Sequence, residues 1–249
     1  SFGRFVPQRF LSPFFSNELR GKKDAQKDKL IKELANEFFD GNKPPIYRFA
    51  GNKIEIHPIW LHYLKQNSSI IEGYLFWKLT GYLQSRNPNI PNISKKIIPP
   101  DNLRNLSAAR RFWNFVLQQM PVHCLYSKTE MKVGKYSIDH FVPWSFVAHD
   151  MLWNLAPIEK NVNSSKSNSL PNMDRYFIAF SKLQYQAYQI VYKAGKYSLL
   201  EDYVMLFNKN NKAIASYSES DFTEGLHKRI SPLIQIATNS GFVPNWTYK

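Results

Sequence analysis

The chain has 249 residues, of which 43% are hydrophobic, and it carries a formal net charge of +14 with a single cysteine. That length and hydrophobic content suffice for one large domain or two of ordinary size. The lone Cys124 excludes an intramolecular disulfide and a zinc cage built from cysteines. The excess of lysine and arginine favours a polyanionic partner, because basic side chains release the counterions that condense on nucleic acid.

Membrane spans are not expected. The most apolar stretch, residues 70–83, is interrupted by Glu72 and Lys78, so it lacks the roughly 18 uninterrupted apolar residues of a spanning helix. Ser1 is not a methionine and no apolar leader follows it, so we interpret Ser1 as a boundary of the sequence. We therefore expect a soluble, cytoplasmic protein, a location that also suits an unpaired cysteine.

The N-terminal part is expected to open with an aromatic-rich, irregular arm of about twenty residues packed on the body. Ser16 or Asn17 can then cap a helix over residues 19–39. Two short apolar runs, residues 46–49 and 54–56, flank a turn sequence and predict a small hairpin.

Two helical segments follow the hairpin. Pro58 opens a helical turn, and residues 69–85 predict a longer helix whose apolar face is expected to be core. Residues 87–100 repeat Asn, Pro and Ile, which cannot continue a helix, so a domain boundary is expected there. Asp101 is expected to cap the next helix, which ends at Met120 before Pro121.

Short strands are expected at residues 122–126 and 135–138, joined by a polar turn. Asp139 and His140 would then emerge at the end of this hairpin, ahead of an irregular loop and a helix-permissive stretch after Pro157. The expected order is strand, strand, loop, helix. Asn163 and Lys166 lie three residues apart, which places them on one face of that helix.

The C-terminal part is expected to contain three helices, over residues 171–194, 198–207 and 220–239, with Gly195 and Gly241 closing the first and the last. We therefore predict three regions: a mostly helical region with a small hairpin at 1–100, the motif with its leading helix at 101–171, and a helical region at 172–249 that packs on the motif.

The polar residues of the motif suit phosphodiester hydrolysis. A divalent ion could sit between Asp139 and Asn163, because carboxylate and amide oxygens suit Mg²⁺ or Mn²⁺. A neutral His140 can take the proton from an attacking water. Lys166 would add positive charge at the phosphate.

The sequence Asp139-His140-Phe-Val-Pro-Trp-Ser-Phe, the positions of Asn154 and Asn163, and Lys166 carry a resemblance to a known family. The segment resembles the HNH endonucleases in their His-Asn-Asn form, the ββα-metal fold, and is similar to the HNH domain of RNA-guided CRISPR effector nucleases. The resemblance covers about fifty of the 249 residues. It implies that Asp139 and Asn163 bind the metal, that His140 is the general base and that Asn154 orients the loop.

The expected fold class is therefore α+β, a predominantly helical body with an embedded ββα-metal motif. The chain departs from many HNH proteins in lacking the two Cys-x-x-Cys pairs of a structural zinc site, because Ser127 follows Cys124 where a second cysteine would stand. No structural zinc is expected. The flanks resemble uncharacterised bacterial HNH proteins, which by association implies defence or restriction.

We expect an enzyme that cuts DNA, with DNA preferred over RNA by resemblance alone. One alternative is a cleavage subunit that a partner or a guide activates or targets, and another is a nucleic-acid-binding module that does not cleave. A homodimer is a reasonable expectation if both strands are cut.

Several further residues have two interpretations. His149, beside Asp150, is the main rival of His140, although a loop histidine more often bonds to backbone. His123 can face either the site or the core. The pairs Arg110–Arg111 and Lys95–Lys96, with the lysines at 22–29, either follow a nucleic-acid backbone or form solvated faces. Trp144 and Trp153 are expected to pack the loop onto the body.

Overall fold

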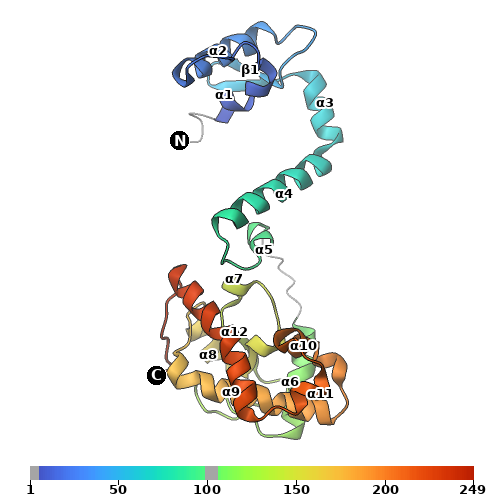
Figure 1. The fold of residues 1–249 in the computed structure, drawn as a ribbon, viewed down its shortest axis with the longest axis vertical. Helices are drawn as coiled ribbons and strands as arrows, with labels where there is room; N and C mark the ends of the chain where they lie inside the picture. The colour runs from blue at the N-terminus through green and yellow to red at the C-terminus, as the bar shows by residue number, and fades with distance from the viewer. Residues whose placement is uncertain (1–5, 99–105) are drawn as a thin grey trace. The chain divides into compact units, whose positions relative to one another are not determined.

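The computed structural model describes residues 6–98 and 106–249. The chain divides into two compact units, residues 1–79 and 80–249, whose elements are labelled in Figure 1. The predicted boundaries after residues 100 and 171 do not coincide with the division between these two units. The three predicted regions remain predictions. The expected cap Asp101 lies outside the described residues.

The first unit contains short helices around one hairpin. Its elements are α1 (Val6–Phe10), η2 (Ser12–Phe15), α2 (Asp24–Glu37), β1 (Tyr47–Ala50), β2 (Lys53–Ile56), α3 (Pro58–Gln66) and the first part of α4 (Ser68–Arg86). The hairpin is confirmed: Tyr47 pairs with Ile56 and Ala50 with Lys53, across a turn in which Gly51 adopts a φ of 60°. Glycine suits this turn because a positive φ brings no Cβ clash.

The N-terminal arm differs from expectation. It forms the helical turns α1 and η2, and Leu11, Phe15 and Leu19 pack into a small core with Ile31 of α2. The helix predicted from residue 19 starts only at Asp24, because Gly21 takes a φ of 76° and separates the arm from α2. Ser16 and Asn17 therefore do not cap α2.

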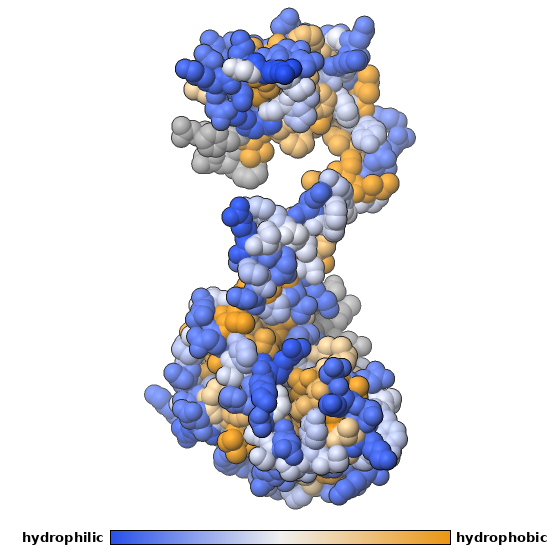
Figure 2. All heavy atoms as spheres, viewed as in Figure 1, coloured by the Kyte–Doolittle hydropathy of each residue, from blue (hydrophilic) through white to orange (hydrophobic). Residues whose placement is uncertain are grey.

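The prediction that the helix at 69–85 buries an apolar face is wrong. Neither α3 nor α4 has a buried side chain among the described residues. Large apolar side chains are exposed on both, and orange surface over α3 is visible in Figure 2. They are Ile59, Leu61, Tyr63, Ile70, Tyr74, Leu75, Trp77, Leu79 and Tyr82.

The second unit carries the motif and the C-terminal helices. Its elements after α4 are α5 (Ile93–Ile97), α6 (Ser107–Gln119), β3 (Ser137–His140), α7 (Trp144–Val147), η3 (Leu152–Asn154), β4 (Leu155–Ile158), α8 (Lys160–Lys166), α9 (Met173–Lys193), η4 (Tyr197–Leu199), α10 (Glu201–Phe207), α11 (Asn211–Ala215) and α12 (Glu219–Asn239). Helices dominate, and the α+β class is confirmed.

The ββα motif is assembled from different strands than predicted. Strand β3 pairs antiparallel with β4, with Asp139 opposite Ala156 and His140 opposite Leu155. Residues 122–126 instead fold into a tight loop with isolated bridges, such as His123 with Glu130. All four residues of β4 are buried, and such a continuously buried strand shows no alternating pattern to identify it in the sequence. The actual order is strand, loop, strand, helix.

Helices α6 and α9 pack together, α12 lies along α9, and α6 also contacts β4 (Figure 1). Phe141, directly after β3, stacks on Phe180 of α9 at 4.3 Å between ring centroids. Trp153 is buried in the same core, as expected for a residue that anchors the loop. The motif is therefore built into the core of this unit.

The C-terminal helices match their predicted positions closely. The side chain of Asn172 caps α9, and Gly195 follows it with a φ of 68°. Ser218 and Asp221 form a capping box at the start of α12. The short helix α11 was not predicted. In residues 6–98 and 106–249, no helix combines the length and apolarity needed to cross a membrane.

Candidate active site

The site begins at the end of β3, where Asp139 and His140 are consecutive and both buried. Successive side chains of a strand point to opposite faces of the sheet. Asp139 accordingly contacts α8, which packs beside β3, whereas His140 contacts the loop between β3 and β4. The strand thus gives the two neighbouring residues different surroundings.

Both carboxylate oxygens of Asp139 are held by buried side chains. The Lys166 ammonium lies 3.0 Å from Oδ1, and the Tyr126 hydroxyl donates to Oδ2 at 3.0 Å. Lys166 Nζ also donates to the carbonyl of His140 at 2.7 Å. Burial, and then the charge of Asp139, raise the pKa of Tyr126 well above its ordinary value, so the phenol stays protonated and donates.

Lys166 is 0% exposed. This burial excludes the interpretation of Lys166 as a solvated helix charge. Its ammonium sits on a metal-ligand candidate inside the protein, so the expected contact with a phosphate remains a prediction.

Asn163 lies one helical turn before Lys166 in α8 and is partly exposed. Residues three apart share a helix face, so the Asn163 side chain is on the same side of α8 as the Lys166 stem that reaches Asp139. No protein hydrogen bond to its side-chain amide occurs within the described parts of the chain. Asp139 and Asn163 are therefore placed on facing elements with oxygen atoms that can serve a cation.

These residues fit a divalent metal with oxygen ligands. The buried Lys166 ammonium shows that Asp139 and the His140 carbonyl already stabilise a positive charge at this point. Mg²⁺ and Mn²⁺ accept one or two protein oxygens when water and phosphate oxygens complete the shell. The described residues contain no cluster of three or more His, Cys, Asp or Glu that could hold a metal, and Cys124 is buried and unbridged.

His140 is paired with Asp150, a contact that the sequence did not reveal. His140 Nε2 lies 2.8 Å from Asp150 Oδ1. The Asp150 side chain is 29% exposed and that of His140 is 8% exposed. Because an ionised carboxylate only accepts hydrogen bonds, this contact places a proton on Nε2, and in the neutral ring the lone pair is then on Nδ1. In the sequence, Asp150 stands out only as the neighbour of His149.

His149 has a structural environment. Its Nδ1 accepts a hydrogen bond from the Met151 amide at 3.4 Å, and its ring packs against Trp153. Burial, followed by repulsion from His140 when that ring is protonated, lowers the pKa of His149 to about 4. His149 is therefore neutral near pH 7 and bonded to backbone, which matches the alternative in which it is a loop histidine.

Asn154 joins the two ends of the loop between β3 and β4. Its side chain accepts from the Val142 amide at 2.8 Å and donates to the Val142 carbonyl at 2.9 Å. Its backbone carbonyl accepts from the Phe141 amide at 2.8 Å. With no exposed surface, Asn154 fixes the chain immediately after His140, in keeping with the orienting role that the resemblance implies.

The C-terminal helices support this loop from the other side. Gln184 of α9 donates to the carbonyl of Leu155 at 2.7 Å, and Asp202 accepts from the Leu152 amide at 2.7 Å. Both bonds hold backbone on either side of Asn154. No pattern in the sequence identifies these two support residues. A single glutamine or aspartate in a helix does not indicate which backbone group it will bond.

The predicted nucleic-acid contacts are placed unevenly. Arg110 and Arg111 are exposed on α6, and the Arg110 guanidinium lies over Tyr136, just before β3. Their contact with nucleic acid stays a prediction. Lys96 instead donates to the backbone carbonyls of Pro91 and Phe146, and burial lowers its pKa. His123 is exposed.

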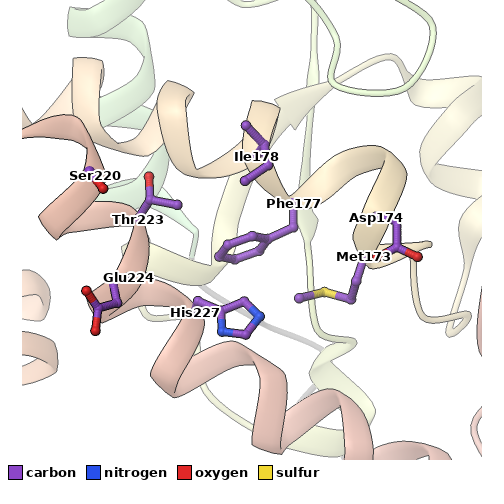
Figure 3. A pocket seen from close by; sticks show the side chains of 8 residues that line it. All are labelled: Met173, Asp174, Phe177, Ile178, Ser220, Thr223, Glu224 and His227. Atoms are coloured by element: carbon purple, nitrogen blue, oxygen red, sulfur yellow. The ribbon is translucent and has the colours of Figure 1, made fainter.

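A groove of about 580 Å³ lies elsewhere in this unit, between α9 and α12. Figure 3 shows Phe177 and His227 next to each other in the groove, in edge-to-face contact at 5.2 Å between ring centroids, with the carboxylates of Asp174 and Glu224 toward its edges. Acidic edges disfavour a phosphate backbone. The residues that line this groove come from α9 and α12 and are not those of the candidate active site, so the two are separate.

The pattern of the HNH endonuclease family matches residues 124–172. No curated protein and no solved structure matches the chain. The matched residues contain Tyr126, β3, the loop that carries Asp150 and Asn154, β4 and α8, whereas Gln184, Asp202 and the arginines of α6 lie outside them. The match supports a nuclease domain at residues 124–172, because HNH endonucleases are phosphodiesterases that act on nucleic acid and typically use a divalent metal.

Proposed function

We propose that this protein is a metal-dependent HNH endonuclease that hydrolyses DNA phosphodiester bonds with Mg²⁺ or Mn²⁺. The observation that carries the proposal is the placement of Asp139, His140 and Asn163 around the paired end of β3 and the facing helix α8. They are the positions to which the resemblance assigns the metal ligands and the general base. The net charge of +14 supports a polyanionic substrate.

The protein groups have distinct tasks. Asp139 and Asn163 would hold the metal, which supplies Lewis-acid stabilisation of the phosphate and of the departing oxygen when bound. Asp150 holds the His140 ring, so that the lone pair of Nδ1 accepts the proton of the attacking water. Asn154 fixes the backbone after His140. Lys166 adds positive charge beside the reacting phosphate. Arg110 and Arg111 contact the sugar-phosphate backbone of the nucleic acid.

DNA is proposed over RNA, and bacterial defence or restriction as the role, on the resemblance of the motif and its flanks. A cytoplasmic location accords with the reduced cysteine. A dimer would provide two sites if both strands are cut, because one such site hydrolyses one strand at a time.

A partner-activated cleavage subunit is the second candidate. Large apolar side chains are exposed along α3 and α4, as described above. Contiguous exposed apolar surface often marks a protein interface. In this version the cleavage chemistry is the same, but cutting requires the partner or guide.

The test is cleavage of plasmid and linear DNA in Mg²⁺, Mn²⁺ or EDTA by the full chain and by His140→Ala. We expect cutting that needs metal and falls by about 10²- to 10⁴-fold in His140→Ala, the usual contribution of a general base. His123→Ala is the matched control, because His123 is exposed and outside the site.

Metal-dependent cutting that survives in His140→Ala contradicts the assigned base. If the wild-type chain cuts no DNA alone but cuts after addition of cell extract, the partner-activated form is favoured. Binding to DNA without cutting under any condition favours a nucleic-acid-binding module.

A further inference from the structure

We infer that Tyr126 and Lys166 are positioning residues that set the metal affinity of Asp139 in opposite directions. This inference deepens the proposed function and rests on it, because it concerns the proposed metal ligand. Neither residue is assigned this task by the family match or by the resemblance. The inference starts from the two oxygens of one carboxylate, each with a different buried partner.

Tyr126 restrains Asp139 without competing for charge. Its hydroxyl donates to Oδ2 at 3.0 Å. Its ring is fixed by edge-to-face contacts with Tyr176 at 4.9 Å and Trp246 at 5.0 Å between centroids. A neutral donor on one oxygen fixes the plane of the carboxylate and leaves its charge available to a cation. Loss of this hydroxyl should therefore weaken metal binding.

Lys166 also restrains Asp139, but it brings a full positive charge. Its ammonium is buried and lies 3.0 Å from Oδ1. A bound divalent ion must share the same carboxylate with this ammonium, and two cations in one buried site repel each other. Without the Lys166 charge, the buried Asp139 carboxylate is uncompensated and no second cation repels the metal. Loss of this charge should therefore tighten metal binding.

The opposite signs separate positioning from general stability. Each residue is buried, so removing either group lowers the stability of the fold. A purely structural role would weaken metal binding in both variants or in neither. Only partners that act on the carboxylate itself move the affinity down in one variant and up in the other.

The experiment measures the Mn²⁺ affinity of the full chain without DNA, by electron paramagnetic resonance of free Mn²⁺ and by calorimetry. Tyr126→Phe should bind Mn²⁺ about 10- to 100-fold more weakly, the usual effect of losing a hydrogen bond to a ligand. Lys166→Met should bind it about tenfold more tightly, the effect of one neighbouring charge at this range.

Each variant has a matched control. Tyr176→Phe removes another buried tyrosine hydroxyl, which accepts from the Tyr248 amide rather than touching Asp139. Lys160→Met removes an exposed lysine from the same helix as Lys166. Both controls should bind Mn²⁺ as the wild type does, and Asp139→Asn should lose binding.

The outcomes are distinguishable. If the wild type does not bind Mn²⁺, or Asp139→Asn binds equally well, the proposed metal site fails and the inference with it. If the wild type binds through Asp139 but Tyr126→Phe matches Tyr176→Phe, the inference alone is overturned. Weaker binding by folded Lys166→Met also overturns it. Should Lys166→Met not fold, the tyrosine pair decides.

Discussion

The carboxylate side of the candidate site and its imidazole side differ in the exposure of the groups that hold them, although Asp139 and His140 are almost equally buried. On the carboxylate side, Asp139 is 5% exposed and both its oxygens have buried partners. On the imidazole side, His140 is paired with Asp150, whose side chain is 29% exposed. One strand supplies both residues from consecutive positions.

The difference fits the separate tasks that we propose. A metal ligand benefits from a fixed, dry carboxylate, because preorganised charge needs no reorganisation when the cation binds. A general base must meet water and exchange a proton, so it needs an approach from solvent. The following predictions test whether the two sides differ as this comparison requires.

The largest stability effect is expected on the carboxylate side. Lys166→Met leaves a buried, uncompensated carboxylate and should lower the unfolding free energy by about 3–5 kcal/mol. Chemical denaturation in EDTA measures this change, with Lys160→Met as the exposed control. A loss below about 1 kcal/mol would mean that Asp139 is solvated, and the contrast between the two sides would disappear.

The next effect lies between the two sides. Asn154→Leu leaves the Val142 amide and carbonyl without their partners, and two unsatisfied buried groups cost about 3 kcal/mol together. Denaturation should show this loss, and cleavage should fall with it because the backbone after His140 is released. Asn161→Leu, an exposed site on α8, should change stability little. Equal stability of the two variants would refute the bracing role of Asn154.

The imidazole side should respond in activity rather than stability. Asp150→Asn keeps the shape of the side chain but replaces the acceptor of the Nε2 proton, so kcat should fall by about 10²-fold with KM nearly unchanged. The unfolding free energy should change little because Asp150 is partly exposed. Asp174→Asn, at the edge of the α9–α12 groove, is the control. An unchanged kcat would remove Asp150 from the site.

The positions of the candidate residues are closer to expectation than the framework that holds them. The motif and its resemblance single out Asp139, His140, Asn154 and Asn163, and the fold places all four in or beside β3, β4 and α8, while their roles remain predictions. The predicted partner of β3 was wrong because its actual partner, residues 155–158, is fully buried and contains a proline. A fully buried strand shows no alternation of polar and apolar residues by which the sequence could identify it.

The missed residues were those that act through tertiary contacts. Tyr126 lies in residues 122–126, which the sequence predicts as a strand but which fold as a loop. The position of its hydroxyl could therefore not be predicted. Gln184 and Asp202 meet the loop only because α9 and α10 fold back onto it. Such contacts depend on the packing of distant elements, and local patterns do not encode them. The prediction that the apolar face of α4 is buried was wrong for the same reason. Periodicity identifies an apolar face, but it does not show whether another element covers that face.

The smallest expected effect is a pH dependence confined to the imidazole side. Burial lowers the pKa of His149 to about 4 from its ordinary value of 6.5. Between these two values the unfolded chain binds a proton that the folded chain does not, so the stability that neutral His149 contributes is complete above pH 6.5 and is lost as the pH falls toward 4. After allowance for partial solvent screening, this loss should approach about 2 kcal/mol.

Denaturation at pH 7 and pH 4.5 measures it as the difference between wild type and His149→Gln, which cannot take up the proton. The exposed His123→Gln variant should follow the wild type at both pH values. If His149→Gln loses as much stability as the wild type on acidification, the imidazole side is not the acid-sensitive one. The acid sensitivity would then arise from groups other than His149, and the pH contrast between the two sides would disappear.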